Sequence, residues 1–240
     1  RATNLLTRCI NIEFISFQWI IQAGRWRLLG LASVPGTNYV IRREVVEALS
    51  GWDENALTED AELTLRLYRA GRRVKFVPGS VTWEQEPETL RVWFRQRHRW
   101  VRGYNYLLRR FAGSLWRARP RRVGLELLYS LSLYYVFFAA IVVSDILFLL
   151  SVTGVIRIEV PGPYSVVWLL AFVTFVLQLV IALASERGED TPPNILLTML
   201  MYFTYCQLWI PVVARAFWDD FITRRPMTWA KTERFEKGSA

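Results

Sequence analysis

Three long stretches with almost no charged side chains lie in the second half of this 240-residue chain, and they constrain its fold more than any other feature. Each is about as long as the roughly 20 apolar residues that a helix needs to cross a bilayer. Residues 1–122, in contrast, carry charges throughout and contain turn signals. The sequence therefore predicts a polar domain followed by a membrane domain. The three stretches are 127–153, in which only Asp145 is charged, 164–184 and 195–214.

The chain divides on this basis into a polar domain over 1–122, a membrane domain over 123–217 and a basic tail over 218–240. With their flanking residues, the apolar stretches cover about 125–153, 164–185 and 195–217. Residues 4–23 are apolar on most of their surface, and residues 88–112 alternate aromatic and arginine side chains with helical spacing. Both patterns predict amphipathic helices that lie in the membrane interface.

The rest of the polar domain predicts alternating strands and helices, which is typical of α/β architecture. A helix is expected from Thr58 to about Ala70, because acidic residues follow a capping threonine and Gly71 ends the pattern. Short strands are expected where β-branched and aromatic residues lie between turn signals. These strand-like runs are 39–41, 74–77 and 81–83.

The charge of the chain is strongly basic, with a formal net charge of +9. Eleven arginines and no acidic residue lie between residues 91 and 122, directly before the first apolar stretch. Basic residues beside a span mark its cytoplasmic side and attract anionic lipid headgroups. We therefore expect membrane lipids as partners, no nucleic acid, and a polar domain that faces the cytoplasm.

Three crossings would place the basic tail outside the cell, against the positive-inside tendency. Two crossings and one re-entrant or interfacial helix would return it to the cytoplasm, and we favour that topology. Cys9 and Cys206 are too few for a disulfide framework or a thiolate metal site, and His98 is the only histidine. The chain starts in mid-pattern at Arg1, which suggests a fragment.

Thr58-Glu59-Asp60 is the first candidate site for chemistry. The dipole and the free N–H groups of a helix N-terminus stabilise an ionised carboxylate, and such a carboxylate can accept a proton from an attacking hydroxyl. Acidic residues are also common in the first turn of a helix as caps. The triplet alone therefore does not distinguish a catalytic role from a capping role.

Gln96-Arg97-His98-Arg99-Trp100 is the second candidate. Gln96, Arg99 and Trp100 follow at i, i+3 and i+4, so all three can face one site. An arginine fork suits phosphate oxygens, and an indole offers a flat apolar face to a sugar ring. The alternative is a basic interfacial helix with aromatic anchors.

The order of these motifs resembles the C-terminal half of processive family 2 glycosyltransferases, which include the synthases of cellulose, chitin, hyaluronan and poly-N-acetylglucosamine. Their T-E-D triplet and Q-x-x-R-W pentapeptide are matched at 58–60 and 96–100, and membrane spans follow. Gly36-Thr37-Asn38 and Gly51-Trp52-Asp53 precede them in the same order. The resemblance implies the C-terminal part of a nucleotide-diphospho-sugar transferase domain of the GT-A type, followed by an α-helical transmembrane domain.

The resemblance also implies roles for single residues. Asp60 would be the general base, and Arg99 with Gln96 would hold the pyrophosphate of the donor. Trp100 would contact the acceptor sugar, while Thr58 and Glu59 would shape the acceptor pocket. Further substrate contacts are implied for Gly36, Thr37 and Asn38, and, near the nucleotide, for Trp229, Lys231, Thr232 and Arg234 of the tail.

A divalent cation, Mg or Mn, is implied as well. The family binds it through a D-x-D motif, and no D-x-D occurs here. We therefore expect no metal ligand in this chain, ligands in an N-terminal half ahead of Arg1, and no activity from the fragment alone.

The implied reaction is inverting transfer of a sugar from a UDP- or GDP-sugar to a growing polysaccharide, coupled to export, by a multi-pass protein of the cell membrane. One alternative is a non-processive lipid glycosyltransferase with a lipid acceptor and a glycolipid product. A different class is a non-catalytic membrane scaffold or polymer-conducting fragment.

Overall fold

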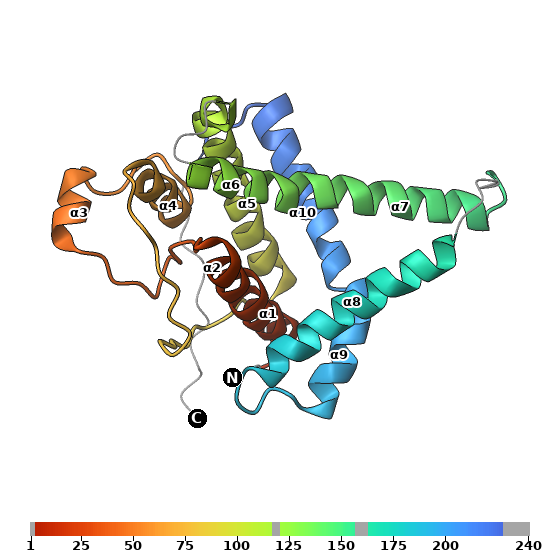
Figure 1. The fold of residues 1–240 in the computed structure, drawn as a ribbon. Coiled ribbons are helices and arrows are strands. Elements are labelled where there is room, and N and C mark those ends of the chain that lie inside the picture. The colour runs from red at the N-terminus through yellow and green to blue at the C-terminus, as the bar shows by residue number, and fades with distance from the viewer. Residues whose placement is uncertain (1–2, 117–120, 157–162, 228–240) are drawn as a thin grey trace.

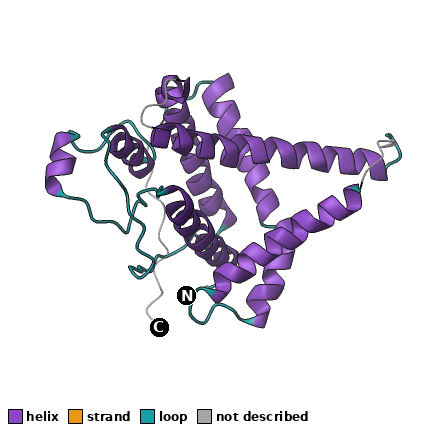
Figure 2. Cartoon of the chain, viewed as in Figure 1, coloured by secondary structure: helices purple, strands orange, loops and turns teal. Residues whose placement is uncertain are grey.

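The structure is a computed structural model that describes residues 3–116, 121–156 and 163–227. In this part of the chain the regular elements are all helical (Figures 1 and 2). They are α1 (Leu5–Ser16), the π-helical η1 (Phe17–Ala23), α2 (Gly24–Leu29), α3 (Arg43–Ala48), α4 (Glu59–Arg69), α5 (Leu90–Trp116), α6 (Arg121–Leu131), the π-helical η2 (Ser132–Val136), α7 (Phe137–Val152), α8 (Tyr164–Ala184), α9 (Pro192–Phe203), the 3-10 turn η3 (Cys206–Leu208), α10 (Trp209–Phe217) and the π-helical η4 (Trp218–Ile222).

The first helix begins at a capping box. The Asn4 side chain accepts a hydrogen bond from the backbone N–H of Thr7, and the Thr7 hydroxyl accepts one from the N–H of Asn4, each at 2.9 Å. Such reciprocal caps satisfy donors that a helix start leaves free. The helix expected over 4–23 forms and continues through η1 and α2 to Gly30, whose φ of 64° ends it in the left-handed region. Its place in a membrane interface stays a prediction.

Helix α5 is the central helix against which α6 and α10 pack. It covers the expected range of 88–112 from Leu90 and extends to Trp116. Helices α6 and α10 pack along it, and α6 also contacts α4 (Figure 1). Trp93, Val101 and Leu107 of α5 are buried, and they pack into two separate apolar clusters. Its aromatic and aliphatic stripe therefore faces protein along much of the helix.

The expected strands at 39–41, 74–77 and 81–83 do not form in the described part of the chain, where these segments are loops. A strand needs a neighbour that pairs with its N–H and C=O groups, and the described residues form no such backbone ladder beside these segments. A side chain joins the two loops instead, because the Asn38 side-chain amide donates to the carbonyl of Ser80 at 2.8 Å. The helix expected at Thr58–Ala70 is present as α4, so the α/β expectation is met only in its helices.

Two helical runs, Arg121–Ser151 and Pro192–Ile222, are long and apolar enough to cross a membrane by length and composition. The apolar part of the middle stretch, Leu169–Ala184, is shorter. The last run changes its backbone course at Thr204 (φ −123°, ψ −79°), between α9 and α10. Among the described residues, these two runs are the ones that meet both criteria.

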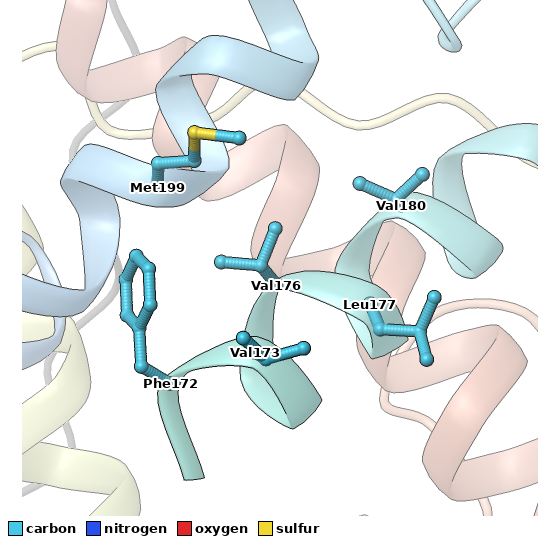
Figure 3. Close-up of a pocket in the computed structure, with 6 residues that line it drawn as sticks. All are labelled: Phe172, Val173, Val176, Leu177, Val180 and Met199. Carbon is cyan, nitrogen blue, oxygen red and sulfur yellow. The ribbon is translucent and has the colours of Figure 1, made fainter. Parts of the chain in front are cut away.

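An open apolar groove of about 270 Å³ lies on α8 beside α9 (Figure 3). Sugars and nucleotides need hydrogen-bond partners that a purely apolar lining lacks, so this groove is not a substrate site. It suits contact with hydrocarbon. The residues that line it are Phe172, Val173, Val176, Leu177, Val180 and Met199.

The end of the last helical run is tied to α5 by buried charges. Asp220 accepts from the Arg102 guanidinium and from the side-chain amide of Asn105, both at 2.8 Å. Asp219 lies 3.1 Å from the His98 ring nitrogen Nε2 and 3.1 Å from Nε of Arg215. Both aspartates are almost fully buried. Buried charges need such partners, so these pairs fix where the final helix lies against α5.

We predict that Asp220→Ala strongly destabilises the protein, because it leaves the Arg102 charge buried without a carboxylate. Breaking one side of such a pair typically costs about 3–5 kcal/mol. Arg215→Ala is the matched control, since Arg215 is about half exposed and Asp219 keeps His98 and Arg225 beside it, so the loss should be at most about 1 kcal/mol. Thermal unfolding in detergent micelles measures both. Equal losses for the two variants would contradict the assignment.

Candidate active site at the junction of α4 and α5

The start of α4 lies directly against α5. Thr58 is buried, and a Cβ atom added at Gly103 of α5 would come within 2.4 Å of the Thr58 hydroxyl oxygen. Real Cβ atoms do not approach other atoms so closely, so a glycine is required at this crossing. Sequence reasoning missed Gly103. The available signal was an isolated glycine inside a helical pattern, which indicates a close contact.

Asp60 stands in the first turn of α4, and Gly36 lies against its carboxylate. A Cβ atom at Gly36 would be 3.2 Å from Asp60 Oδ2, while Oδ1 accepts from the N–H of Ala61 at 2.8 Å. Burial raises the pKa of Asp60 to about 6, and the nearby charge of Glu59 adds to the rise. The Ala61 hydrogen bond and the Arg99 charge oppose it. The carboxylate is therefore ionised near neutral pH and close to its titration range.

Arg99 brings a positive charge to the same place. Its Nη1 donates to the carbonyl of Leu57 at 3.2 Å, in the segment that leads into α4. Burial lowers the pKa of Arg99, and the charges of Glu59 and Asp60 oppose that shift. The structure thus brings the two predicted motifs together, with the arginine of one beside the carboxylates of the other.

Gln96 and Trp100 lie on α5 with Arg99 and Gly103, at the spacing expected for one helix face. The side-chain oxygen of Gln96 is buried and has no hydrogen-bond partner among the described residues. Trp100 packs edge to face on Phe14 of α1, with ring centroids 6.2 Å apart. The face of α5 that carries the pentapeptide therefore lies between α1 and α4.

Thr37 and Asn38, which were predicted with Gly36, make their side-chain bonds to the loop that follows α4. The Thr37 hydroxyl bonds to Glu84, and Asn38 bonds to Ser80. Of the three residues, Gly36 is the one placed against the Asp60 carboxylate. The other two shape the loop in front of it.

Backbone contacts hold the segment before Gly36 in place on α4. The N–H and C=O groups of Ala32 bond to the Tyr68 hydroxyl at 2.8 and 2.6 Å. The N–H of Val34 bonds to the Thr64 hydroxyl at 2.8 Å. Thr64 and Tyr68 stand one and two turns after Asp60 on α4. Sequence reasoning missed both residues, whose side chains take the place of a paired strand.

Gly51-Trp52-Asp53 has a structural role in this arrangement. Asp53 accepts from the Tyr106 hydroxyl at 2.8 Å and pairs with Arg110, both on α5. These bonds help to lower the pKa of Asp53 against the opposing effect of its burial. The loop that precedes α4 is thereby anchored to the same helix as the site.

The described residues contain no cluster of three or more histidine, cysteine or acidic side chains that could hold a metal ion. Arg99 lies beside Glu59 and Asp60 and offsets part of their negative charge, so these two carboxylates do not form a cation site of their own, and the Arg99 guanidinium is the group that suits an anion. Trp229, Lys231, Thr232 and Arg234 of the tail lie outside the described residues.

Comparison of the sequence with known proteins finds a family model and relatives that match this chain. Residues 1–185 match the family model described as "Glycosyl transferase family group 2". The chain is 40% identical over 239 residues to "Probable glycosyltransferase YdaM" of Bacillus subtilis (strain 168), covering 98% of this chain and 57% of that protein. It is 27% identical over 114 residues to "Poly-beta-1,6-N-acetyl-D-glucosamine synthase" of Staphylococcus aureus (strains COL and MSSA476), covering 47% of this chain and 28% of those proteins.

The chain therefore spans little more than half the length of the first relative and about a quarter of the second. No solved structure shows a significant match. The family model covers more than half of the chain, including both motifs and the junction of α4 and α5. This chain belongs to glycosyl transferase family group 2.

Proposed function

We propose that this chain provides the acceptor and leaving-group side of an inverting membrane glycosyltransferase, which transfers a sugar from a UDP- or GDP-sugar to a growing polysaccharide and couples transfer to export. The observation that carries the proposal is the junction of α4 and α5, where the Asp60 carboxylate and the Arg99 guanidinium share one partly buried site. The similarity to a polysaccharide synthase over 47% of the chain supports a polymer product.

Asp60 is suited to act as the general base. A pKa of about 6 leaves the carboxylate ionised at neutral pH, and it makes the group a stronger base than an exposed aspartate. The acceptor hydroxyl would give its proton to Asp60 as its oxygen attacks the anomeric carbon. Thr58 and Glu59 on the same turn would border the acceptor pocket.

Arg99 is suited to stabilise the leaving diphosphate. An arginine fork binds phosphate oxygens through charge-assisted bonds, and a partly buried site strengthens them. Gln96, one turn earlier, has a buried side-chain oxygen that finds no partner within the described part of the chain. Its amide group would add a hydrogen bond to the donor, and the indole of Trp100 would hold the acceptor sugar.

Members of this family commonly use divalent cations. Because the residues beside Arg99 do not fit a cation site, we derive no step through a metal, and its ligands would lie outside the described residues. The tail residues Trp229, Lys231, Thr232 and Arg234 remain proposed nucleotide contacts.

The two long apolar helices support a multi-pass position in the cell membrane. The arginine-rich α5 precedes the first of them, which favours a catalytic part that faces the cytoplasm, where nucleotide sugars are made. A glycolipid-forming enzyme would share this site. Product size from labelled donor separates the two, because a polymer gives a high-mass product and a glycolipid gives a single small species.

We predict that Asp60→Asn removes transfer and leaves folding intact. Loss of a general base lowers turnover by at least about a hundredfold. The assay measures incorporation of radiolabelled sugar by membranes from cells that make the full-length protein to which this chain belongs. Glu54→Gln, which neutralises an exposed carboxylate in the loop before α4, is the matched control and should keep normal synthesis. Normal polymer synthesis by Asp60→Asn would remove Asp60 from the base role.

We predict that the rate of transfer rises with pH through about pH 6. The reaction needs the ionised carboxylate, and burial raises the pKa of Asp60 to about 6, so the active form is lost below that pH and complete above it. The pH dependence of kcat/KM, which reports the titrating groups of the free enzyme, checks this. A rate that already reaches its plateau near the pKa of an exposed aspartate, about 4, would contradict it.

We predict that Arg99→Ala weakens binding of UDP or GDP by about tenfold or more, because a hydrogen bond between charged groups contributes about 1.5–3 kcal/mol. Isothermal titration calorimetry of the purified full-length protein with each nucleotide provides the measurement. Arg91→Ala, an exposed arginine in the first turn of α5, serves as the control and should bind normally. Equal affinities for wild type and Arg99→Ala would exclude Arg99 from the nucleotide site.

A further inference from the structure

Arg97 is a buried arginine inside the pentapeptide, and neither the sequence motif nor the proposed chemistry gives it a role. It is 1% exposed, whereas Arg99, two residues later, is only partly buried. Burial of a guanidinium is unfavourable unless opposite charges and hydrogen bonds compensate it. Its surroundings therefore have to explain why it is inside the protein.

Glu13 of α1 is the charge partner of Arg97. Its Oε2 accepts from Nη2 of Arg97 at 2.7 Å and from the hydroxyl of Tyr205 at 2.6 Å. The Tyr205 hydroxyl in turn accepts from the indole N–H of Trp93 at 3.0 Å. One carboxylate thus joins α1, α5 and the bend between α9 and α10 through a continuous set of hydrogen bonds.

A second carboxylate faces the same guanidinium. Burial raises the pKa of Glu86 to about 7, and the positive charge of Arg97 opposes that rise. Glu86 lies in the loop that leads into α5. Near neutral pH Glu86 therefore carries only part of a negative charge near Arg97, and Glu13 is the carboxylate that bonds to it directly.

The guanidinium of Arg97 lies over the ring of Trp100. The distance from Cζ to the ring centroid is 4.1 Å, and the rings of Phe14 and Trp209 are 5.1 and 5.6 Å away. Arginine stacks on indole through its planar, weakly hydrated cation, and lysine cannot reproduce that surface. Phe14 closes the arrangement by packing on the edge of the same indole.

We propose that Arg97, fixed by Glu13, is a positioning residue that holds the indole of Trp100 in the orientation needed for the acceptor. This inference rests on the proposed function, because it presupposes that Trp100 contacts the acceptor. An indole on a helix surface can adopt several rotamers. Contact with the Arg97 guanidinium and with the ring of Phe14 favours one of these rotamers for Trp100. The ion pair with Glu13 keeps the guanidinium in that position.

The arrangement also links the site to the membrane helices. Tyr205 directly follows the change in backbone course at Thr204, and Trp209 begins α10. Both touch the cluster that fixes Arg97. A shift of the bend would therefore move Glu13 or Arg97, and the orientation of Trp100 would follow.

Two variants and a matched control test the proposal. Arg97→Lys keeps the charge for Glu13 and loses the flat stack, and Glu13→Gln removes the charge while leaving an amide oxygen for Tyr205. Arg102→Lys changes an arginine of similar burial that pairs with Asp220, away from Trp100. The assay uses membranes that contain the full-length protein, with labelled donor, and measures the share of consumed donor that reaches product, compared with the share released as free sugar.

We expect Arg97→Lys and Glu13→Gln to lower the ratio of transfer to donor hydrolysis by about tenfold, because a small misplacement of a positioning group costs one to two orders of magnitude. UDP affinity by calorimetry should be unchanged in both. Arg102→Lys should lower thermal stability alone. A normal ratio in both test variants overturns the proposal, and so does an equal fall in Arg102→Lys, which indicates a purely structural effect.

A second measurement does not depend on turnover. In protein labelled with 5-fluorotryptophan, the ¹⁹F resonance that disappears in Trp100→Phe belongs to Trp100. Arg97→Lys should shift or broaden that resonance, and Arg102→Lys should leave it in place. An unmoved resonance overturns the positioning role. Absence of transfer in the wild type, with the resonance moved as expected, would instead count against the proposed function and leave the contact between Arg97 and Trp100 established.

Discussion

The arrangement of this chain depends on the need of buried arginines on α5 for carboxylate partners. Arg97 and Arg102 lie inside the protein, and their partners come from opposite ends of the chain, Glu13 from α1 and Asp220 from η4. An unpaired buried charge is strongly unfavourable, so each element has to lie where its carboxylate meets the arginine on α5. With α1 and the last helical run held on it, α5 can present Arg99 and Trp100 between α1 and α4.

Local sequence patterns correctly predicted the features that depend on neighbouring residues, above all the helices. Helix caps and periods of three to four residues found α1, α4 and α5 within a few residues, because a helix satisfies its backbone bonds within its own segment. The motif residues Asp60 and Arg99 were predicted to share a site, and they lie together in the structure. Their catalytic roles stay a prediction.

The sequence did not predict features that depend on segments far apart in the chain. Strands at 39–41 and 74–77 needed partners that the described chain does not offer, and side chains such as Thr64 and Tyr68 took over the backbone bonds of a neighbouring segment. Asp219 and Asp220 had no evident role in the sequence, since their partners lie more than a hundred residues earlier. Gly103 matters only because Thr58 lies against it.

In the sequence, the arginine-rich stretch at 91–122 looks like one basic surface. In the structure, its arginines have different surroundings. Arg97 and Arg102 are buried counter-ions, Arg99 lies beside Asp60, and Arg91 is exposed. Spacing on the helix separates these groups, because neighbours along the chain point about 100° apart. Arg97 and Arg99 therefore face different partners although they are two residues apart. A motif defined only by Gln96, Arg99 and Trp100 leaves out the residue whose guanidinium lies over that tryptophan.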